Sequence, residues 1–298
     1  MSDRERATAF ICTGCGTQYP PGPEPPAHCT ICEDEREFVG PGGQQWTTLA
    51  AMRGFHHNRF EQLEPGITLI VTEPAFAIGQ QAYLVETEHG NVLWETLAYL
   101  DEATIAEIER RGGVEAISIS HPHFYTTMGE WSRALGEVPI HQHADNRPWV
   151  MNPTPAIRFW TGESLPLLPG LTVVRCGGHF PGSSVLHWAG GADGKGLLLS
   201  GDTIMVASDR RWVSFMHSFP NLIPLDAASV HGITAAVEPY MFVRIYGGVP
   251  GQIMHADAKA AVRRSVDRYV AHLQGHESTP RTDATSLNVT GSRAADGD

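Results

Sequence analysis

Apolar residues along the chain gather in short segments that are separated by Gly, Pro, Asn and Asp turns. Segments of about four to eight apolar or alternating residues are typical of β-strands. Residues 81–87 and 91–96 flank His89-Gly90 and predict a β-hairpin. The full set of predicted strands is 67–71, 81–87, 91–96, 116–120, 138–143, 171–176, 185–188, 196–200 and 243–246.

Two segments show the helical period instead. Residues 101–111 place Ile105 and Ile108 on one face, and the glycines that follow predict the end of this helix. Residues 257–273 have a similar apolar face, with Asp257 as the expected N-cap. The first helix lies between two predicted strands, which gives a strand–helix–strand order and favours an α/β fold.

The segment 114–130 contains the first group of candidate metal ligands. The strand predicted at 116–120 leads directly into His121-Pro122-His123. If the chain stays extended there, side chains two positions apart point the same way, so both imidazoles face one side. Neutral imidazole is a common zinc ligand, and Pro122 restricts the backbone between the two rings. The alternative is a pair of polar loop histidines.

Two later strands also end in polar residues beside glycine. His179 follows Gly177-Gly178, and Asp202 follows Gly201. Polar residues on loops at strand ends are where α/β folds usually place their chemistry. With His121 and His123 they would form a site of three imidazoles and one carboxylate. Such a site leaves room for water, as a catalytic zinc requires.

Four of the five cysteines lie in one short N-terminal window. Cys12-x-x-Cys15 and Cys29-x-x-Cys32 have the spacing of a closed, structural four-cysteine zinc site. A segment this small buries too little apolar surface to fold alone, so bound metal would supply its folding energy. The alternative is a pair of redox dithiols.

Composition restricts the compartment and the partners. The 298 residues are 42% hydrophobic and carry a formal net charge of −12. Nucleic-acid binding normally needs a basic surface, so no nucleic-acid partner is expected. No run approaches the ~18–20 apolar residues of a membrane span, and the N-terminus is not signal-like, so we expect a cytoplasmic protein without a membrane partner.

Three motifs, in order, resemble the metallo-β-lactamase superfamily. That family carries HxHxDH after a strand, a GH before a PGS-like turn, a GD, and a late His; here they are HPHFYT, GGHFPGSS and SGDT. The resemblance covers about residues 55–260. It implies an α/β fold, an αββα sandwich of two packed mixed sheets with outer helices. The expected division is a zinc-ribbon-like segment at 1–40, a hydrolase domain at 41–276 and a disordered tail at 277–298.

The chain departs from that family at the second metal site. Tyr125 and Thr126 stand where the family has Asp and His, and neither side chain replaces them well. We therefore expect one catalytic metal, held by His121, His123, His179 and Asp202. His255 is the candidate for the late second-site histidine; its rivals are His217 and His231.

The resemblance predicts a metal-dependent hydrolase that attacks a small ester, thioester, lactone or amide with a zinc-bound hydroxide. Asp202 would ligate the metal or orient the water, and Tyr125 would donate to the developing oxyanion. The expected cofactors are one catalytic and one structural zinc, with iron or manganese as alternatives at the catalytic site. The competing functions are a degenerate binding module that interacts through the zinc knuckle, and a mononuclear non-haem iron protein. The sequence does not indicate the oligomeric state.

Overall fold

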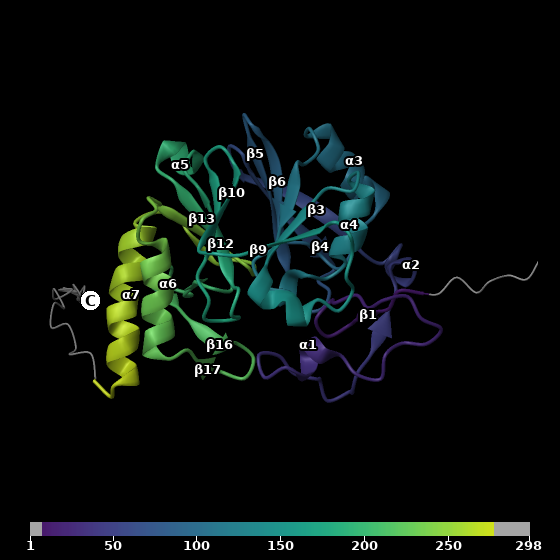
Figure 1. Ribbon diagram of the computed structural model, residues 1–298, viewed down its shortest axis with the longest axis horizontal. Helices are drawn as coiled ribbons and strands as arrows, with labels where there is room; N and C mark the ends of the chain where they lie inside the picture. The colour runs from purple at the N-terminus through teal and green to yellow at the C-terminus, as the bar shows by residue number, and fades with distance from the viewer. Residues whose placement is uncertain (1–7, 277–298) are drawn as a thin grey trace, which may run out of the picture.

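The computed structural model describes residues 8–276, in which two mixed β-sheets pack face to face (Figure 1). The larger sheet has the strand order β3-β4-β5-β6-β7-β8-β9. Its strands are β3 (His57–Glu64), β4 (Ile67–Glu73), β5 (Gln81–Thr87), β6 (Gly90–Trp94), β7 (Ala116–Ser118), β8 (Ile140–His143) and β9 (Ile157–Trp160). Strands β6 to β9 are parallel and the others are antiparallel.

The second sheet has the order β10-β11-β12-β13-β18-β19. Only the β13–β18 pair is parallel. Its strands are β10 (Ser164–Leu168), β11 (Leu171–Arg175), β12 (Ser184–Trp188), β13 (Leu197–Gly201), β18 (Arg244–Gly247) and β19 (Ile253–Met254). Two short hairpins lie outside both sheets: β14 (Met205–Val206) with β15 (Val213–Ser214), and β16 (Met216–Ser218) with β17 (Ile223–Pro224).

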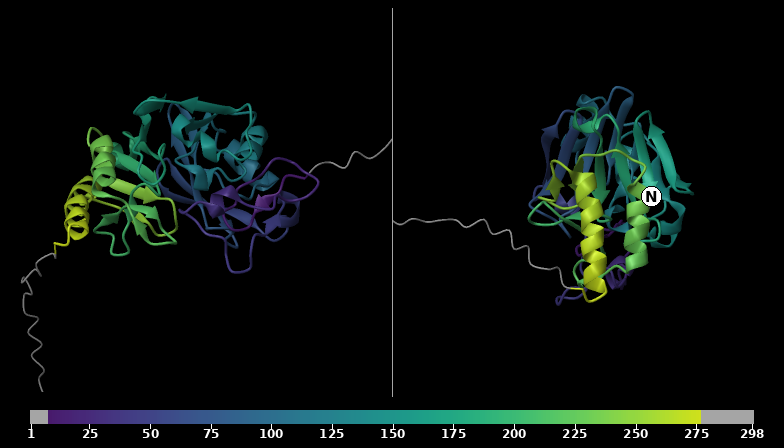
Figure 2. Two further views of the ribbon diagram at one scale, coloured as in Figure 1. Left: turned by 60° about the horizontal axis from the view of Figure 1, so that its bottom comes forward. Right: turned by 90° about the vertical axis from the view of Figure 1, so that its left-hand side faces the viewer.

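Helices cover the outer face of each sheet, which completes the predicted αββα sandwich (Figure 2). Helices α3 (Glu102–Arg110) and α4 (Met128–Ala134) pack on the larger sheet, whereas α6 (Ala227–Val237) and α7 (Ala258–Leu273) pack on the smaller one. The remaining helices are short: α1 (Thr30–Glu33), α2 (Leu49–Met52), α5 (Gly191–Gly194), and the 3-10 helices η1 (Pro122–Phe124) and η2 (Ala144–Trp149). No helix within residues 8–276 is long and apolar enough to span a membrane.

The alternation of side chains along each strand explains the layers. In β5, Tyr83 and Val85 face the opposite sheet, while Ala82 and Leu84 face α3 and α4. The same alternation holds in β13, where Leu198 lies under α6 and α7 between two residues that face the central layer. A strand buried on both faces shows nearly continuous apolar residues, which is the pattern that predicted it.

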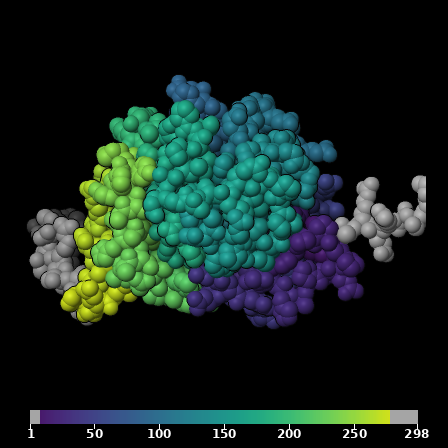
Figure 3. All heavy atoms as spheres, in the orientation of Figure 1, coloured from purple at the N-terminus to yellow at the C-terminus, as the bar shows by residue number. Residues whose placement is uncertain are grey.

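The N-terminal segment lies along one edge of the sandwich (Figures 1 and 3). It contains α1 and the two-stranded sheet of β1 (Ile11–Cys12) and β2 (Trp46–Thr47). Its cysteine cluster packs against Trp149 and Met151, which lie between strands β8 and β9 of the larger sheet. On the other side, the Asn221 amide donates to the backbone carbonyls of Glu35 and Glu37. The segment therefore bridges both halves of the sandwich.

Local structure differs from the sequence prediction in three respects. The strand before the His121-Pro122-His123 motif ends at Ser118, and the motif continues into η1 instead of remaining extended. Asp257 does not cap α7: its backbone is left-handed, with φ of 54°, and its side chain accepts no capping hydrogen bond. The pattern also missed strands β3, β9, β10 and β19 and helices α4 and α6. The tail predicted at 277–298 lies outside the described residues.

Gly196, just before β13, is expected to be essential for the smaller sheet. It has φ of +80°, and a Cβ there would overlap the carbonyl oxygen of Met241. We predict that Gly196→Ala lowers the free energy of unfolding by roughly 2–5 kcal/mol, through left-handed strain plus the overlap. The matched control is Gly194→Ala: φ is +78° there, but nothing lies within 4 Å of the added methyl group. Urea unfolding should show that the control loses only about 1–2 kcal/mol of unfolding free energy. Equal losses in the two variants would show that the overlap with Met241 does not contribute.

Candidate metal centre

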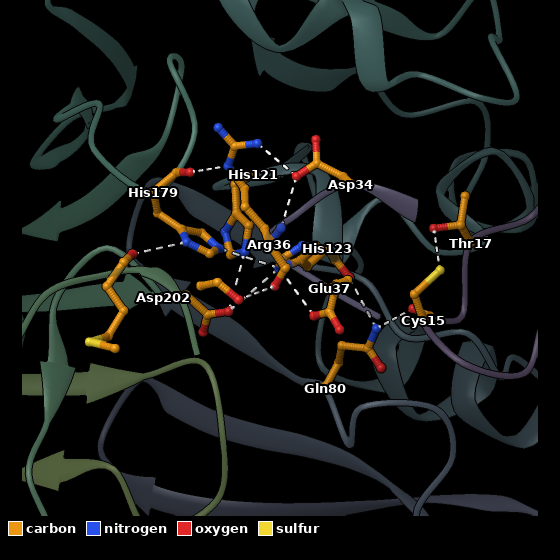
Figure 4. Close-up of polar contacts among 12 residues, drawn as sticks. Cys15, Thr17, Asp34, Arg36, Glu37, Gln80, His121, His123, His179 and Asp202 are labelled. Atoms are coloured by element: carbon orange, nitrogen blue, oxygen red, sulfur yellow. Dashed lines mark hydrogen bonds and ion pairs between the residues drawn. The ribbon is translucent and has the colours of Figure 1, made fainter. Parts of the chain in front are cut away.

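Four side chains from loops at the ends of both sheets converge on one buried point (Figure 4). His121 and His123 follow β7, His179 follows β11, and Asp202 follows β13. Their candidate ligand atoms all lie within 4.8 Å of one another. The three histidines are at most 2% exposed. The structure thus brings together the four residues that the sequence proposed as a metal site.

Hydrogen bonds on the far side of two rings orient them toward this point. The Nδ1 of His179 lies 3.2 Å and 3.0 Å from the backbone carbonyl oxygens of Met216 and His217. Carbonyl oxygens only accept hydrogen bonds, so Nδ1 must carry the proton and donate it. The lone pair of Nε2 is then directed at the centre, as a metal ligand requires.

His121 is held in a similar way. Its Nδ1 lies 2.8 Å from the Ser120 hydroxyl, while the Ser120 backbone N–H donates to Glu95 at 3.1 Å. Its Nε2 lies 3.3 Å from Asp202 Oδ2. Gly201 makes this approach of β13 possible, because a Cβ there would lie 2.6 Å from the Ser120 hydroxyl.

The electrostatics of the site suit a cation. Burial lowers the pKa values of His121 and His179, so both rings are neutral at pH 7. Burial opposes the ionisation of Asp202, but its contacts with His121 and His123 hold its pKa below the ordinary range. The buried Nε2 of His121 has no hydrogen-bond partner among the described residues. Three imidazoles, one carboxylate and a buried ring nitrogen without a hydrogen-bond partner fit a divalent metal ion.

Sequence reasoning missed two carboxylates near this centre. Glu95 is fully buried at the end of β6, and burial together with the charge of Asp202 raises its pKa. Glu37 comes from the N-terminal segment and lies 3.7 Å from His123 Nδ1. Burial, with the charge of Asp202, raises the pKa of Glu37 to about 7. Glu95 lies inside the strand predicted at 91–96, and no local pattern marked either Glu95 or Glu37 as part of a site.

The other candidate histidines lie outside the four-residue ligand cluster, and Tyr125 and Thr126 make other contacts. The Tyr125 hydroxyl is buried without a hydrogen-bond partner in the described chain, and its ring packs with the apolar cluster under α3 and α4. The Thr126 hydroxyl lies 2.8 Å from that of Thr96. His231 and His255 are exposed, and His217 pairs with Glu35 at 2.6 Å. The donor role of Tyr125 and the ligand role of His255 remain predictions.

The second candidate metal site is the predicted cysteine cluster. The sulfurs of Cys12, Cys15, Cys29 and Cys32 lie within 4.8 Å of one another, and all four residues are buried. The thiols are free rather than disulfide-bonded. The knuckle turns back on itself through a hydrogen bond from the Gly16 N–H to the Cys12 carbonyl, of 2.9 Å. This arrangement is that of a closed four-thiolate metal site.

Comparison with known proteins places this chain in a family. The chain is 48% identical over 266 residues to the uncharacterized protein YmaE of Bacillus subtilis (strain 168), covering 89% of this chain and 96% of YmaE. The chain belongs to the YmaE family. No family model matches the sequence.

Solved structures identify the fold. VMB-1 superposes with a TM-score of 0.55 at 12% identity, covering 73% of this chain and 98% of VMB-1. The metallo-β-lactamase FIM-1 from Pseudomonas aeruginosa, in its mono-zinc form, gives 0.53 at 14% identity over 72% and 96% of the two chains. The metallo-β-lactamase DIM-1 gives 0.53 at 14% identity over 73% and 98%. The YmaE-family chain therefore has the metallo-β-lactamase fold, as its motifs predicted.

Two separate metal sites lead to a prediction of metal content. The purified protein should carry about two divalent ions per chain, and Cys12→Ser with Cys15→Ser should remove about one, because two of four thiolates cannot close a tetrahedral site. Cys176→Ser is the matched control, since this fifth cysteine lies outside the cluster. Elemental analysis of both variants checks the expectation. Equal metal content in both would contradict the structural site.

Proposed function

We propose that this YmaE-family protein is a metal-dependent hydrolase that acts on a small ester, thioester, lactone or amide. One observation carries the proposal: the candidate ligand atoms of His121, His123, His179 and Asp202 lie within 4.8 Å of one another in a buried site. A zinc ion there would lower the pKa of its water toward ~7 and act as a Lewis acid on a substrate carbonyl. The shared fold supports this reading only in general terms, because one fold hosts many reactions.

The surrounding residues would hold the histidine rings in place and fix which ring nitrogen carries the proton. The Met216 and His217 carbonyls fix the proton of His179 on Nδ1, and Ser120 holds the outer nitrogen of His121. Rings held in this way lose little freedom when they ligate, which favours tight binding. The Phe180 ring packs 5.0 Å from that of His123 and 5.1 Å from that of His179, centroid to centroid, and shields one side from water.

Asp202 has two properties that its proposed role requires. Its pKa lies below the ordinary range, so it stays an anion at neutral pH. Its side chain is 12% exposed, whereas that of His121 is fully buried. An ionised, slightly accessible carboxylate beside the metal can balance part of the positive charge and accept a hydrogen bond from water. We assign it as a ligand that also orients the nucleophile.

Ligand substitutions should abolish hydrolysis because the remaining groups cannot hold the ion. His121→Ala with His179→Ala should remove activity on a panel of chromogenic esters, thioesters, lactones and amides, together with one equivalent of metal. Asp202→Asn should lower the rate by roughly 10²–10⁴-fold, the scale of a positioned acid–base group. The control is His89→Ala, an exposed histidine that pairs with Glu88. Activity that survives the double histidine variant would refute the proposal.

Tyr125→Phe tests the predicted oxyanion donor separately. Loss of one such hydrogen bond would cost ~10²–10³-fold in rate. Because the Tyr125 ring lies in an apolar cluster, an unchanged rate would instead assign it to packing. Elemental analysis of the same protein distinguishes zinc from iron or manganese. If the metal-replete protein hydrolyses no substrate of the panel, the result would favour a non-catalytic binding module.

A further inference from the structure

The four-cysteine segment makes direct contacts with the histidine site as well as with the rest of the fold. Glu37 follows the last cysteine, Cys32, by only a few residues. Between them, the Arg36 guanidinium donates from Nε to the His179 carbonyl oxygen at 2.5 Å and lies 4.4 Å above the Phe180 ring centre. Asp34 holds the other side of this guanidinium at 2.7 Å. The segment that the cysteines fold is thus fastened to one of the ligand loops.

Gln80 forms a second connection between the two sites. Its side-chain amide donates to the Cys15 carbonyl at 2.7 Å and to the His123 carbonyl at 3.0 Å. The same amide group therefore fixes the first cysteine knuckle relative to the backbone of a histidine ligand. Figure 4 shows Gln80 between Cys15 and Glu37, with the cysteine knuckle on one side and the histidines on the other.

These contacts place the Glu37 carboxylate beside the four-residue cluster, against His123. The residue is 8% exposed, and its Oε1 lies 3.7 Å from His123 Nδ1, the nitrogen that also lies 3.3 Å from His179 Nε2. Within residues 8–276, no arginine or lysine pairs with this carboxylate. Burying an unpaired carboxylate is costly, and a cation bound beside it would offset that cost.

We propose that Glu37, delivered by the four-cysteine segment, is an additional ligand of the metal ion bound by His121, His123, His179 and Asp202. The inference rests on the metal site of the proposed function but not on its hydrolytic activity. As a ligand, this second carboxylate would offset a second unit of the ion's charge. It also makes the occupancy of the histidine site depend on the fold of the cysteine segment.

The test measures metal affinity and geometry, not turnover. Apo-protein is titrated with Co²⁺ in competition with a chromophoric chelator, and the visible bands of the histidine site are followed apart from the thiolate charge-transfer bands of the cysteine site. Glu37→Gln should weaken Co²⁺ binding at the histidine site by about tenfold or more and change its visible spectrum, because the neutral amide is a poorer ligand. The cysteine-site bands should stay unchanged, which also shows that the segment is folded.

Glu35→Gln is the matched control. It lies on the same segment, but its carboxylate is 69% exposed and pairs with His217 instead of the ligand cluster. It should leave the affinity and spectrum of the histidine site as in the unmodified protein. Cys12→Ser with Cys15→Ser should weaken the histidine site at least as much as Glu37→Gln, since it releases the whole segment.

Each result has one interpretation. If Glu37→Gln behaves like Glu35→Gln in both affinity and spectrum, Glu37 is not a ligand, while the proposed metallohydrolase stands. If the unmodified protein binds Co²⁺ only at the cysteines, both the proposed function and this inference are overturned. A histidine site that keeps full affinity after the double cysteine change contradicts the dependence on the segment.

Discussion

The structure depends on satisfying polar ligand atoms that are buried at the meeting point of two sheets. Three imidazole rings lie within contact distance, their centroids 4.8–5.1 Å apart, and a carboxylate lies beside them. Without a cation, polar ring atoms face one another in a region from which water is largely excluded. Hydrogen bonds hold the Nδ1 atoms of His121 and His179 and the backbone carbonyl of His123. The ring atoms that face the centre are left to bind a metal ion.

This constraint also explains why the surrounding packing is so specific. His121 is held through Ser120, whose backbone bonds to the buried Glu95, and Gly201 is small enough to let the second sheet approach. The loop of His179 is held by the β16 carbonyls on one side and by Arg36 on the other. Ligands from separate loops keep one geometry only if those loops cannot move independently.

The N-terminal segment contributes to the site in the same way. A closed four-thiolate cluster has no open position for chemistry. Its contribution is mechanical: it holds a short chain against both halves of the sandwich and places Arg36 and Glu37 beside the ligands. The sequence predicted a boundary at residue 40, with this segment as an addition to the hydrolase domain. Its contacts show that it also completes the wall of the histidine site.

The sequence by itself determined what local patterns encode. Alternating apolar residues predicted most strands of both sheets, and glycines after residue 111 marked the end of α3. The four residues that converge were predicted from the motifs HPH, GGH and SGD. Each motif places a polar side chain near the end of a strand, and strand ends gather at the edges of sheets. The spacing of the cysteines predicted their cluster, since two short knuckles place four sulfurs together.

Only the tertiary structure decided what depends on contacts between distant segments. Glu37 reaches His123 across more than eighty positions of the chain, and no pattern near residue 37 indicates that contact. The same holds for Glu95, for the packing of Tyr125 in an apolar cluster and for the exposure of His255. Which side chains surround a metal is fixed by the way sheets and segments pack, and local sequence carries little of that information.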